Sequence, residues 1–326
     1  MIVGSIRNGK TERGFYSYME EKIDVSIIIV SYNTVDLTIH CIESIYAKTQ
    51  QVSFEVIVVD NGSKDNTVQR IKDQFKKVRV IETGKNLGFG KANNIGLKEA
   101  RGKYILYLNS DTILLNNGVK DFFDYFEIHS HENIGAIGSL LLDKDNKITH
   151  SYGHFPTYME LCRIQAVTII INMIKWLCTL FHLEKKYVEW TAKKTDREEA
   201  YYGDVDYITG ADLFMKNNSD AFFDPIYFMY SEEVDLEKKL AVKNLRRVII
   251  PGPMIIHYQD HNREQGKMQL PGYPQIFQEI SNIEYSKNHF GHNAKLLRIL
   301  TKMDFLNPIV RPLVKPAKRI IAESIK

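Results

Sequence analysis

The sequence has few cysteines and no long uncharged apolar run. Its 326 residues include only Cys41, Cys162 and Cys178, whose spacing matches neither a disulfide framework nor a zinc site. Residues 1–22 lack the apolar core of a signal sequence and are expected to form a loose extension. Internal repeats and low-complexity tracts are also absent from the sequence. These features predict a globular protein of the reducing cytoplasm.

An excess of charge of one sign is also lacking. The 43 Lys/Arg and 40 Asp/Glu residues leave a net charge of +3, so we expect no nucleic-acid partner. The stretch Gly88-Phe89-Gly90 lacks the third glycine of a dinucleotide-binding fingerprint. Residues 4–11 match the P-loop pattern, but no buried strand precedes them and no helix follows. The first segment is therefore not interpreted as a dinucleotide fingerprint, and the second is not interpreted as a P-loop.

Alternating strands and helices dominate the first third of the chain. Apolar runs predict strands at residues 25–30, 54–59, 78–81 and 104–108. Helical spacing of apolar residues occurs over residues 37–47, 66–75 and about 91–100. This alternation predicts an α/β fold with a mostly parallel central sheet, wound by right-handed crossovers. The polar loops after the strands should then meet at one sheet edge, where such folds bind ligands.

Two carboxylates are predicted to lie on that edge. Asp60 follows the second strand, and Asp111 follows the fourth strand in the sequence Asn109-Ser110-Asp111-Thr112. Carboxylates among asparagines and glycines suit the ribose and base of a nucleotide. No lysine-rich cradle lies nearby, so the diphosphate charge calls for Mg²⁺ or Mn²⁺ held on Asp111. The alternative is an ordinary turn that caps the next segment.

Four stretches carry a resemblance to a known family: residues 25–33, 55–63, 86–112 and 228–236. Their order and spacing resemble the family 2 inverting glycosyltransferases of the GT-A fold, in the bacterial rhamnosyltransferase-like branch. The match covers residues 23 to about 260. The resemblance implies a nucleotide-binding set of Ser31, Tyr32, Asn33, Asp60, Asn86, Gly88, Asn93 and Ser110. It also implies a metal site at Asp111 and His257, with Asn109 replacing the first acid of the family's Asp-x-Asp motif.

The acidic cluster Glu232-Glu233-Val234-Asp235 falls where this family places its general base. Displacement at an anomeric carbon requires the acceptor hydroxyl to lose a proton, which a carboxylate can accept. The alternative interpretation is an acidic helix N-terminus stabilised by the helix dipole. We expect both interpretations to hold: Glu232 and Asp235 stabilise the helix N-terminus, and Glu233 accepts the proton.

Three further segments are expected around the reaction centre. The turn at Gly210, Ala211 and Asp212 resembles the family's acceptor-facing turn, although a plain hairpin turn is the alternative. His257 is either a ligand of the metal or diphosphate or a structural histidine. Arg263, in the polar segment 258–272, is a candidate clamp on the diphosphate, and that segment is a candidate lid.

The predicted organisation is an extension (1–22), a GT-A domain (23–290) and a basic amphipathic segment (291–326). The GT-A domain divides into a nucleotide half, about 23–115, and an acceptor half, about 116–290. The apolar stretch 161–183 is interrupted by Arg163 and Lys175, so we expect a buried or interfacial helix between the halves rather than a membrane span. Residues 295–326 hold eight Lys/Arg against two acids. They either lie on anionic lipid or pack against the body.

The sequence therefore predicts a metal-dependent, inverting glycosyltransferase. The preferred reaction moves L-rhamnose from dTDP-rhamnose to a hydroxyl of a cell-surface or lipid-linked polysaccharide. A UDP-hexose donor is the closest alternative, and a catalytically inactive glycan- or nucleotide-binding module is an alternative of another class. We expect a cytoplasmic protein, and peripheral contact with the inner face of the plasma membrane stays open.

Overall fold

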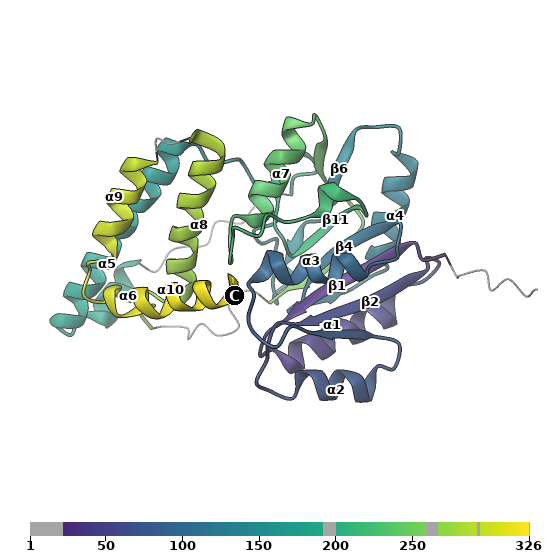
Figure 1. Cartoon of the computed structure of the whole chain (residues 1–326), viewed down its shortest axis with the longest axis horizontal. Helices are drawn as coiled ribbons and strands as arrows, with labels where there is room; N and C mark the ends of the chain where they lie inside the picture. The colour runs from purple at the N-terminus through teal and green to yellow at the C-terminus, as the bar shows by residue number, and fades with distance from the viewer. Residues whose placement is uncertain (1–21, 192–199, 259–266, 292–293, 326) are drawn as a thin grey trace, which may run out of the picture.

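The computed structural model describes residues 22–191, 200–258, 267–291 and 294–325. These residues form an α/β domain with a separate group of helices beside it (Figure 1). All but the last residue of the predicted extension, and Arg263 in the candidate lid, lie outside the described residues.

The first seven elements alternate as the sequence predicts. They are β1 (Val25–Ser31), α1 (Val35–Lys48), β2 (Phe54–Asp60), α2 (Thr67–Gln74), β3 (Arg79–Glu82), α3 (Phe89–Glu99) and β4 (Tyr104–Asn109). The four strands pair in parallel in the order β3-β2-β1-β4. Helices cover both faces of these strands, so the strands can be apolar along their whole length. The predicted parallel α/β sheet is confirmed.

The remaining strands extend this sheet and make it mixed. They are β6 (Ile134–Gly138), β9 (Gly203–Asp204), β11 (Asp212–Lys216) and β12 (Arg246–Ile249). The order of the eight-stranded sheet is β3-β2-β1-β4-β11-β6-β12-β9, with β11 antiparallel to both its neighbours. Two small sheets are built from β5 (Thr112–Leu114), β7 (Leu141–Leu142), β8 (Tyr152–Gly153), β10 (Tyr207–Ile208) and β13 (Ile255–His257). Strands β12 and β13 are close in sequence but belong to different sheets.

Alternate side chains of the parallel strands fill two apolar cores. Ile27 and Ile29 of β1 pack with α1, α2 and α4 (Gly118–Ile128) on one face. Ile28 packs on the other face, where α3 and α7 (Glu232–Val242) lie next to the short turn η1 (Ser219–Ala221). The sheet is thus the rigid middle layer from which the polar loops project.

Five helices form the helical module beside this domain: α5 (Tyr158–Leu180), α6 (Glu184–Thr191), α8 (Tyr273–Phe290), α9 (Lys295–Asp304) and α10 (Arg311–Ile325) (Figure 1). Helix α5 begins at a capping box, in which Thr157 and Glu160 satisfy each other's backbone amides. It packs along α9 rather than between the two halves of the domain, which corrects its predicted position. It is also mostly exposed, so of the two predicted alternatives the buried helix is excluded and the interfacial helix stays a prediction.

The basic C-terminal segment packs against the rest of the chain. Val310 and Ala317 are buried with Ile276 and Phe277 of α8. At the end of α10, Lys85 Nζ donates a hydrogen bond to the carbonyl of Glu323 at 2.8 Å. A lysine at this position also interacts favourably with the helix dipole. Much of the apolar face of residues 295–325 is therefore used in packing.

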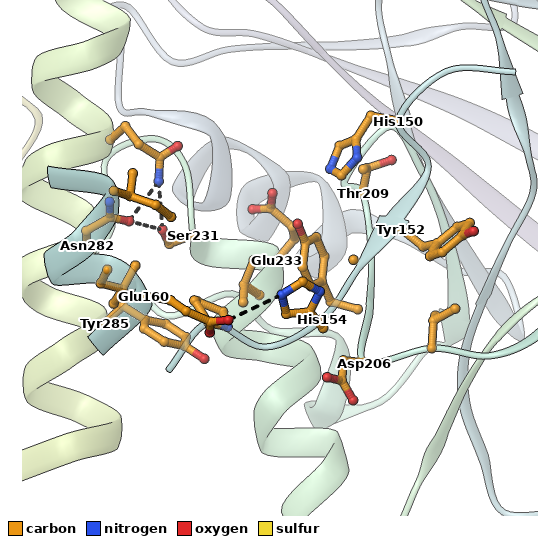
Figure 2. A pocket seen from close by; sticks show the side chains of 18 of the residues that line it. His150, Tyr152, His154, Glu160, Asp206, Thr209, Ser231, Glu233, Asn282 and Tyr285 are labelled. Atoms are coloured by element: carbon orange, nitrogen blue, oxygen red, sulfur yellow. Dashed lines mark hydrogen bonds and ion pairs between the residues drawn. The ribbon is translucent and has the colours of Figure 1, made fainter. Parts of the chain in front are cut away.

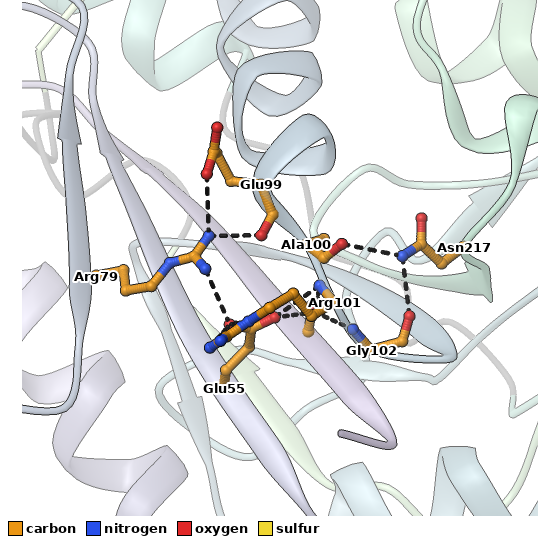
Figure 3. Close-up of polar contacts among 8 residues, drawn as sticks. Glu55, Arg79, Glu99, Ala100, Arg101, Gly102 and Asn217 are labelled. Atoms are coloured by element: carbon orange, nitrogen blue, oxygen red, sulfur yellow. Dashed lines mark hydrogen bonds and ion pairs between the residues drawn. The ribbon is translucent and has the colours of Figure 1, made fainter. Parts of the chain in front are cut away.

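A buried glutamate holds the three parallel strands together at the edge opposite the predicted site (Figure 3). Glu55 of β2 accepts hydrogen bonds from the Ser26 hydroxyl at 2.7 Å, the Arg101 backbone amide at 2.8 Å and the Arg101 guanidinium at 3.0 Å. Burial alone would raise the pKa of Glu55, but these hydrogen bonds outweigh it and lower the pKa. The ionised form of Glu55 therefore stabilises the fold.

We expect Glu55→Gln to destabilise the protein by about 1.5–3 kcal/mol at pH 7, the usual range for hydrogen bonds to a charged group. Because the folded-state pKa is depressed, this stabilisation is complete above the ordinary glutamate pKa of 4.5 and is lost as pH falls through the folded-state value. Urea unfolding of both proteins at pH 7 and pH 4 tests this, with exposed Glu99→Gln as control. An equal difference at both pH values would contradict it.

Candidate functional site

Three strand ends form the edge at which the predicted site lies. In the parallel register, Ser31 of β1 pairs with Asp60 of β2, and Val30 pairs with Asn109 of β4. The loops that follow these strands therefore start at one level of the sheet. This confirms that the loops bearing Asp60 and Asp111 meet at one edge.

The first two loops are linked by asparagine and serine contacts. The backbone amide of Asn33 donates to Ser63 Oγ at 2.9 Å, and Asn33 Oδ1 accepts from the Lys64 amide at 2.8 Å. Ser31 is buried, with its hydroxyl 2.8 Å from that of Thr38. Asn33 and Ser31 therefore shape the rim. Among the first-loop candidates, only the exposed Tyr32 is open to stack on a base.

Asp60 has an unused acceptor atom at this rim. Its side chain is 4% exposed, and Oδ2 accepts a hydrogen bond from the Ser63 amide at 3.2 Å. Oδ1 is buried with no hydrogen-bond partner among the described residues. A buried carboxylate oxygen without a donor is destabilising unless a ligand supplies one. The hydroxyl or N–H groups of a nucleoside are donors of this kind.

The glycine loop before α3 is held in place from two sides. Asn61 Nδ2 donates to Asn86 Oδ1 at 3.1 Å and to the Gly88 carbonyl at 3.2 Å. Gly88 has φ +88°, and a Cβ there would lie 2.0 Å from the carbonyl oxygen of Phe228, so only glycine fits. Asn86 and Gly88 thus set the loop shape, and Asn61 is a rim residue that the sequence prediction did not include.

Two other predicted nucleotide residues also have partners within the protein. Asn93 is buried, and its amide donates to the Phe89 carbonyl at 3.2 Å. Ser110 Oγ lies 3.3 Å from Thr34 Oγ1, which joins the loops after β1 and β4. Direct contact of Asn93 and Ser110 with a nucleotide stays a prediction.

The predicted metal residues lie together at the end of β4. His257 Nε2 lies 3.3 Å from Asp111 Oδ1 and 3.2 Å from Asn109 Nδ2. The pairing of β13 with β5, in which His257 faces Thr112, creates this contact. Carboxylate, amide and imidazole groups are suitable ligands for Mn²⁺ and, except for imidazole, for Mg²⁺. The described residues contain no cluster of three or more His, Cys, Asp or Glu that could hold a metal. Asp111, Asn109 and His257 therefore suit a divalent ion whose remaining coordination positions are filled by oxygen atoms of a bound ligand.

The turn before β11 connects this metal region to the acidic cluster. The carbonyl of Ala211 accepts a hydrogen bond from the Asn109 amide at 3.0 Å. A Cβ on Gly210 would lie 3.8 Å from Cβ of Glu233, so Gly210 and Glu233 are adjacent. The predicted position of this turn beside the reaction centre is consistent with these contacts.

Asp212 is a buried structural acid in this structure. Its Oδ2 accepts hydrogen bonds from the amide and the hydroxyl of Ser139, at 2.8 Å and 2.5 Å. Burial raises the pKa of Asp212 to about 7. The side chain is fully buried, so its predicted contact with an acceptor sugar does not occur in this conformation.

The three acids at the start of α7 have different environments. Glu233 lines a large cleft, whereas Glu232 is 2% exposed and Asp235 is fully buried. Asp235 Oδ1 lies 2.7 Å from His289 Nε2, and Oδ2 lies 2.6 Å from Lys239 Nζ. Burial opposes the charge on Asp235, but these partners lower its pKa. Asp235 thus anchors the helix, as predicted, and Glu233 is the acid of this cluster that faces the cleft.

Electrostatics distinguish the two neighbouring glutamates. Burial raises the pKa of Glu233. Burial, followed by the negative charge of Glu233, raises the pKa of Glu232 well above its ordinary value. A carboxylate with a raised pKa is a stronger base than a solvated one, which suits a proton acceptor that works near neutral pH.

The backbone that carries Glu233 is strained. Tyr230 and Ser231 adopt φ values of +71° and +66°, a left-handed conformation that is rare for residues other than glycine. Helix α8 supports this conformation because Gln278 Nε2 donates to Ser231 Oγ at 3.1 Å, and Ser231 Oγ lies 3.3 Å from Asn282 Oδ1. No local sequence pattern predicts this support from α8.

The cleft around Glu233 has a volume of about 1800 Å³ and lies between α5, α7, α8 and the small β8–β10 sheet (Figure 2). Figure 2 shows Glu233 with His150, His154 and Tyr152 on one side and Ser231 with Asn282 on the other. Ligand sites are typically 300–1,000 Å³, so this space can accept more than one sugar unit. Asp111 instead lines a smaller cavity of about 570 Å³ with His40, Glu43 and Tyr258.

Residues 26–171 match the family described as Glycosyl transferase family 2. This part of the chain, less than half of its residues, is similar to that family. Over 94% of the chain, the structure is similar to a mannosyltransferase from Pyrobaculum calidifontis that was solved with GDP-Man and Mn²⁺. The TM-score is 0.52 at 14% identity, and the match covers 76% of that chain. Similarity at this level confirms the GT-A fold.

Two curated proteins that are similar to this chain have named activities. An N-acetylglucosaminyl-diphospho-decaprenol L-rhamnosyltransferase of Mycobacterium tuberculosis is 25% identical over 64% of this chain and 67% of its own. A UDP-Glc:alpha-D-GlcNAc-diphosphoundecaprenol beta-1,3-glucosyltransferase of Escherichia coli is 26% identical over 55% of this chain and 76% of its own. The first curated relatives are uncharacterized glycosyltransferases of Rickettsia, and this chain spans only about a quarter of their length. One of them is 32% identical over 165 residues, which cover 48% of this chain and 24% of that protein.

We expect Asp60→Asn to weaken nucleoside diphosphate binding about 10- to 100-fold, because a hydrogen bond to a charged acceptor is lost or reversed. Calorimetry with UDP and dTDP measures this. The exposed Asp73→Asn on α2 is the matched control. Unchanged affinity for both nucleotides would place the nucleoside elsewhere.

Asp111→Asn is expected to remove the increase in nucleotide affinity that Mn²⁺ produces, because the charged ligand is replaced by a neutral one. Nucleotide titrations with Mn²⁺ and with EDTA provide the comparison. Glu43→Gln, in the same small cavity, should keep the metal effect. If the effect survives in Asp111→Asn and vanishes in Glu43→Gln, the metal ligand is Glu43.

Proposed function

We propose that the protein transfers a sugar from a nucleoside diphosphate donor to a hydroxyl of a lipid-linked acceptor, with inversion at the anomeric carbon. One observation carries this proposal. Of the three acids at the start of α7, Glu233 lines the 1800 Å³ cleft, whereas its two neighbours are buried. The cleft thus offers one carboxylate as a base beside a space large enough for an acceptor.

The donor is assigned to the carboxyl edge of β1, β2 and β4. Asp60 Oδ1, which has no hydrogen-bond partner within the part of the chain that the structure describes, supports nucleoside binding there, and the exposed Tyr32 ring supports stacking of the base. The named relatives use different donor sugars, so the comparisons favour a nucleotide sugar without fixing which one. We keep dTDP-L-rhamnose as the preferred donor because of the resemblance of the sequence, and UDP-hexose as the alternative.

Asp111 and His257 are the residues that would hold Mn²⁺, or Asp111 alone Mg²⁺. When bound, such an ion neutralises the negative charge that develops on the leaving diphosphate. Asn109 Nδ2 lies 3.2 Å from His257 Nε2, the same ring nitrogen that faces Asp111, so this contact would give way when the ion binds. The donor set supports metal dependence, and this stays a proposal until metal binding is measured.

Glu233 is assigned the general base. As the acceptor oxygen attacks the anomeric carbon, the hydroxyl proton passes to the Glu233 carboxylate. The bond from the anomeric carbon to the phosphate oxygen breaks, and the diphosphate leaves with the electron pair. Attack on the face opposite the leaving group inverts the configuration. The raised pKa of Glu233 increases its ability to accept this proton.

The lining of the cleft supports a lipid-linked acceptor. Ile164, Val167 and Ile171 of α5 form an apolar wall, while Arg163 and Arg247 add positive charge. Such a lining suits a sugar that carries both a diphosphate and an isoprenoid chain. Both named relatives act on sugars linked to a polyprenol by a diphosphate. We place the reaction in the cytoplasm, at the inner face of the plasma membrane.

The decisive experiment incubates the protein with a panel of dTDP-, UDP- and GDP-sugars and measures release of the nucleoside diphosphate. Each donor is tested with and without a polyprenyl diphosphate sugar, in Mn²⁺, Mg²⁺ or EDTA. Release that requires donor, metal and acceptor supports the proposal. Nucleotide binding without release under any condition would support the inactive binding module instead.

Glu233→Gln should keep donor affinity near the wild-type value and lower turnover by about 10²–10⁴-fold, because shape is retained and basicity is lost. The matched control is Glu232→Gln, one residue earlier on the same strained segment. It should retain most of the turnover if folding, followed by circular dichroism, is unchanged. Near-normal turnover of Glu233→Gln together with an inactive Glu232→Gln would assign the base to Glu232.

A further inference from the structure

Helix α5 exposes most of its apolar side chains and buries two polar ones, Gln165 and Asn172. The residues that it buries are Leu161, Cys162, Gln165 and Asn172. The side chains that it exposes form what we call the apolar face of α5: Ile164, Val167, Ile170, Ile171, Met173, Leu177 and Leu180. A helix on the surface of a water-soluble domain has the opposite arrangement. Exposed apolar surface of this extent marks a contact with another apolar phase.

The inward polar contacts fix this orientation. Asn172 Nδ2 lies 3.0 Å from both carboxylate oxygens of Asp304, which is fully buried on α9. Gln275 of α8 donates to Asp304 at 3.0 Å and to Glu279 at 2.8 Å. Rotating α5 to bury its isoleucines would leave Asp304 with one fewer donor. The apolar face therefore stays outside.

More apolar side chains lie at the same end of the molecule. Helices α6 and α9 both contact α5, at the end of the helical module remote from the sheet (Figure 1). Their exposed apolar residues, with those of the α5–α6 turn, are Phe181, Leu183, Trp190, Leu296, Ile299 and Met303. Both tryptophans of the chain, Trp176 and Trp190, lie in α5 and α6. Tryptophan is enriched where proteins meet the membrane interface.

Positive charge is concentrated in α5, α6 and α9 together with α10. Residues 158–191 and 295–325 hold 11 Lys/Arg and 5 Asp/Glu, a difference of +6, while the whole chain has +3. One of the five acids, Asp304, is buried in the module. The remainder of the chain is consequently net negative. Apolar side chains surrounded by basic residues match an anionic lipid surface, which supplies acyl chains and negative headgroups together.

We propose that the apolar face of α5 inserts into one leaflet of an anionic bilayer, with α5 lying in the plane of the membrane. Among the described helices, α5 alone is long and apolar enough to cross a bilayer by length and composition. However, its other face packs along α9 and α8, so lipid cannot surround it. Because Ile164, Val167 and Ile171 also line the Glu233 cleft, a lipid acceptor would enter beside α5. Only this last step rests on the proposed function.

Vesicle flotation of the full chain tests the proposal without donor or acceptor. We expect binding to vesicles of phosphatidylcholine with 30% phosphatidylglycerol and at least 10-fold weaker partition to phosphatidylcholine alone. Ile170→Glu and Leu177→Glu, which lie outside the cleft lining, should each lower partition at least 10-fold. The matched control is Val242→Glu at the end of α7. Val242 is 80% exposed, and this variant should bind the vesicles normally.

A measurement on the unmodified protein covers the case in which these variants fold poorly. Both tryptophans lie in α5 and α6, so lipids brominated along the acyl chain should quench most of the intrinsic fluorescence. Absent quenching, or equal binding by Ile170→Glu and wild type, would overturn the proposal. A dimer in solution that Ile170→Glu dissociates, with no vesicle binding, would instead assign this face to a second copy of the chain. If the wild-type protein binds vesicles but transfers no sugar, that result would contradict the proposed function and leave the membrane proposal standing.

Discussion

The parallel pairing of β1 with β2 and β4 is the constraint on which the rest of the site depends. In this register, Ser31, Asp60 and Asn109 end their strands at one level. The polar loops follow from those ends and carry the unpartnered Asp60 oxygen and the Asp111–His257 contact. The Glu55 hydrogen bonds hold the same three strands at the opposite edge, so stability and site geometry share one framework.

The second half of the site is attached to this framework by backbone contacts. The Phe228 carbonyl accepts a hydrogen bond from the Phe89 amide at 2.9 Å, directly after Gly88. This contact fixes the segment that ends in the strained Tyr230 and Ser231 and begins α7. Helix α8 completes the support, and α5 closes the far side of the cleft. The loops after β1, β2 and β4, Glu233 and helix α5 are therefore connected through a short chain of contacts.

The positions of the strands and helices up to β4 could be predicted because apolar residues recur in each with a regular spacing and a polar turn ends each element. The assignment of the chemistry to Glu233 came from the family resemblance and the need for a proton acceptor, and it stays a prediction; the structure shows that Glu232 and Asp235 are buried while Glu233 lines the cleft. Contacts between distant segments were not predictable, because no local pattern encodes them: Asn282 on α8 meets Ser231, and Asp212 turns inward to Ser139. The orientation of α5 was missed for the same reason, since Asp304 lies 132 positions from its partner Asn172.

The pH dependence of kcat/KM for sugar transfer tests the central claim, that Glu233 accepts the acceptor proton. It is best measured in a His150→Gln/His154→Gln background, because both imidazoles line the cleft. Glu232, Glu237 and Tyr207 also surround Glu233, and burial raises the pKa of each. Because Glu233 acts ionised and burial raises its pKa, activity should fall on the acid side with a midpoint above the ordinary 4.5. A profile that stays flat to pH 4.5 would contradict the assignment.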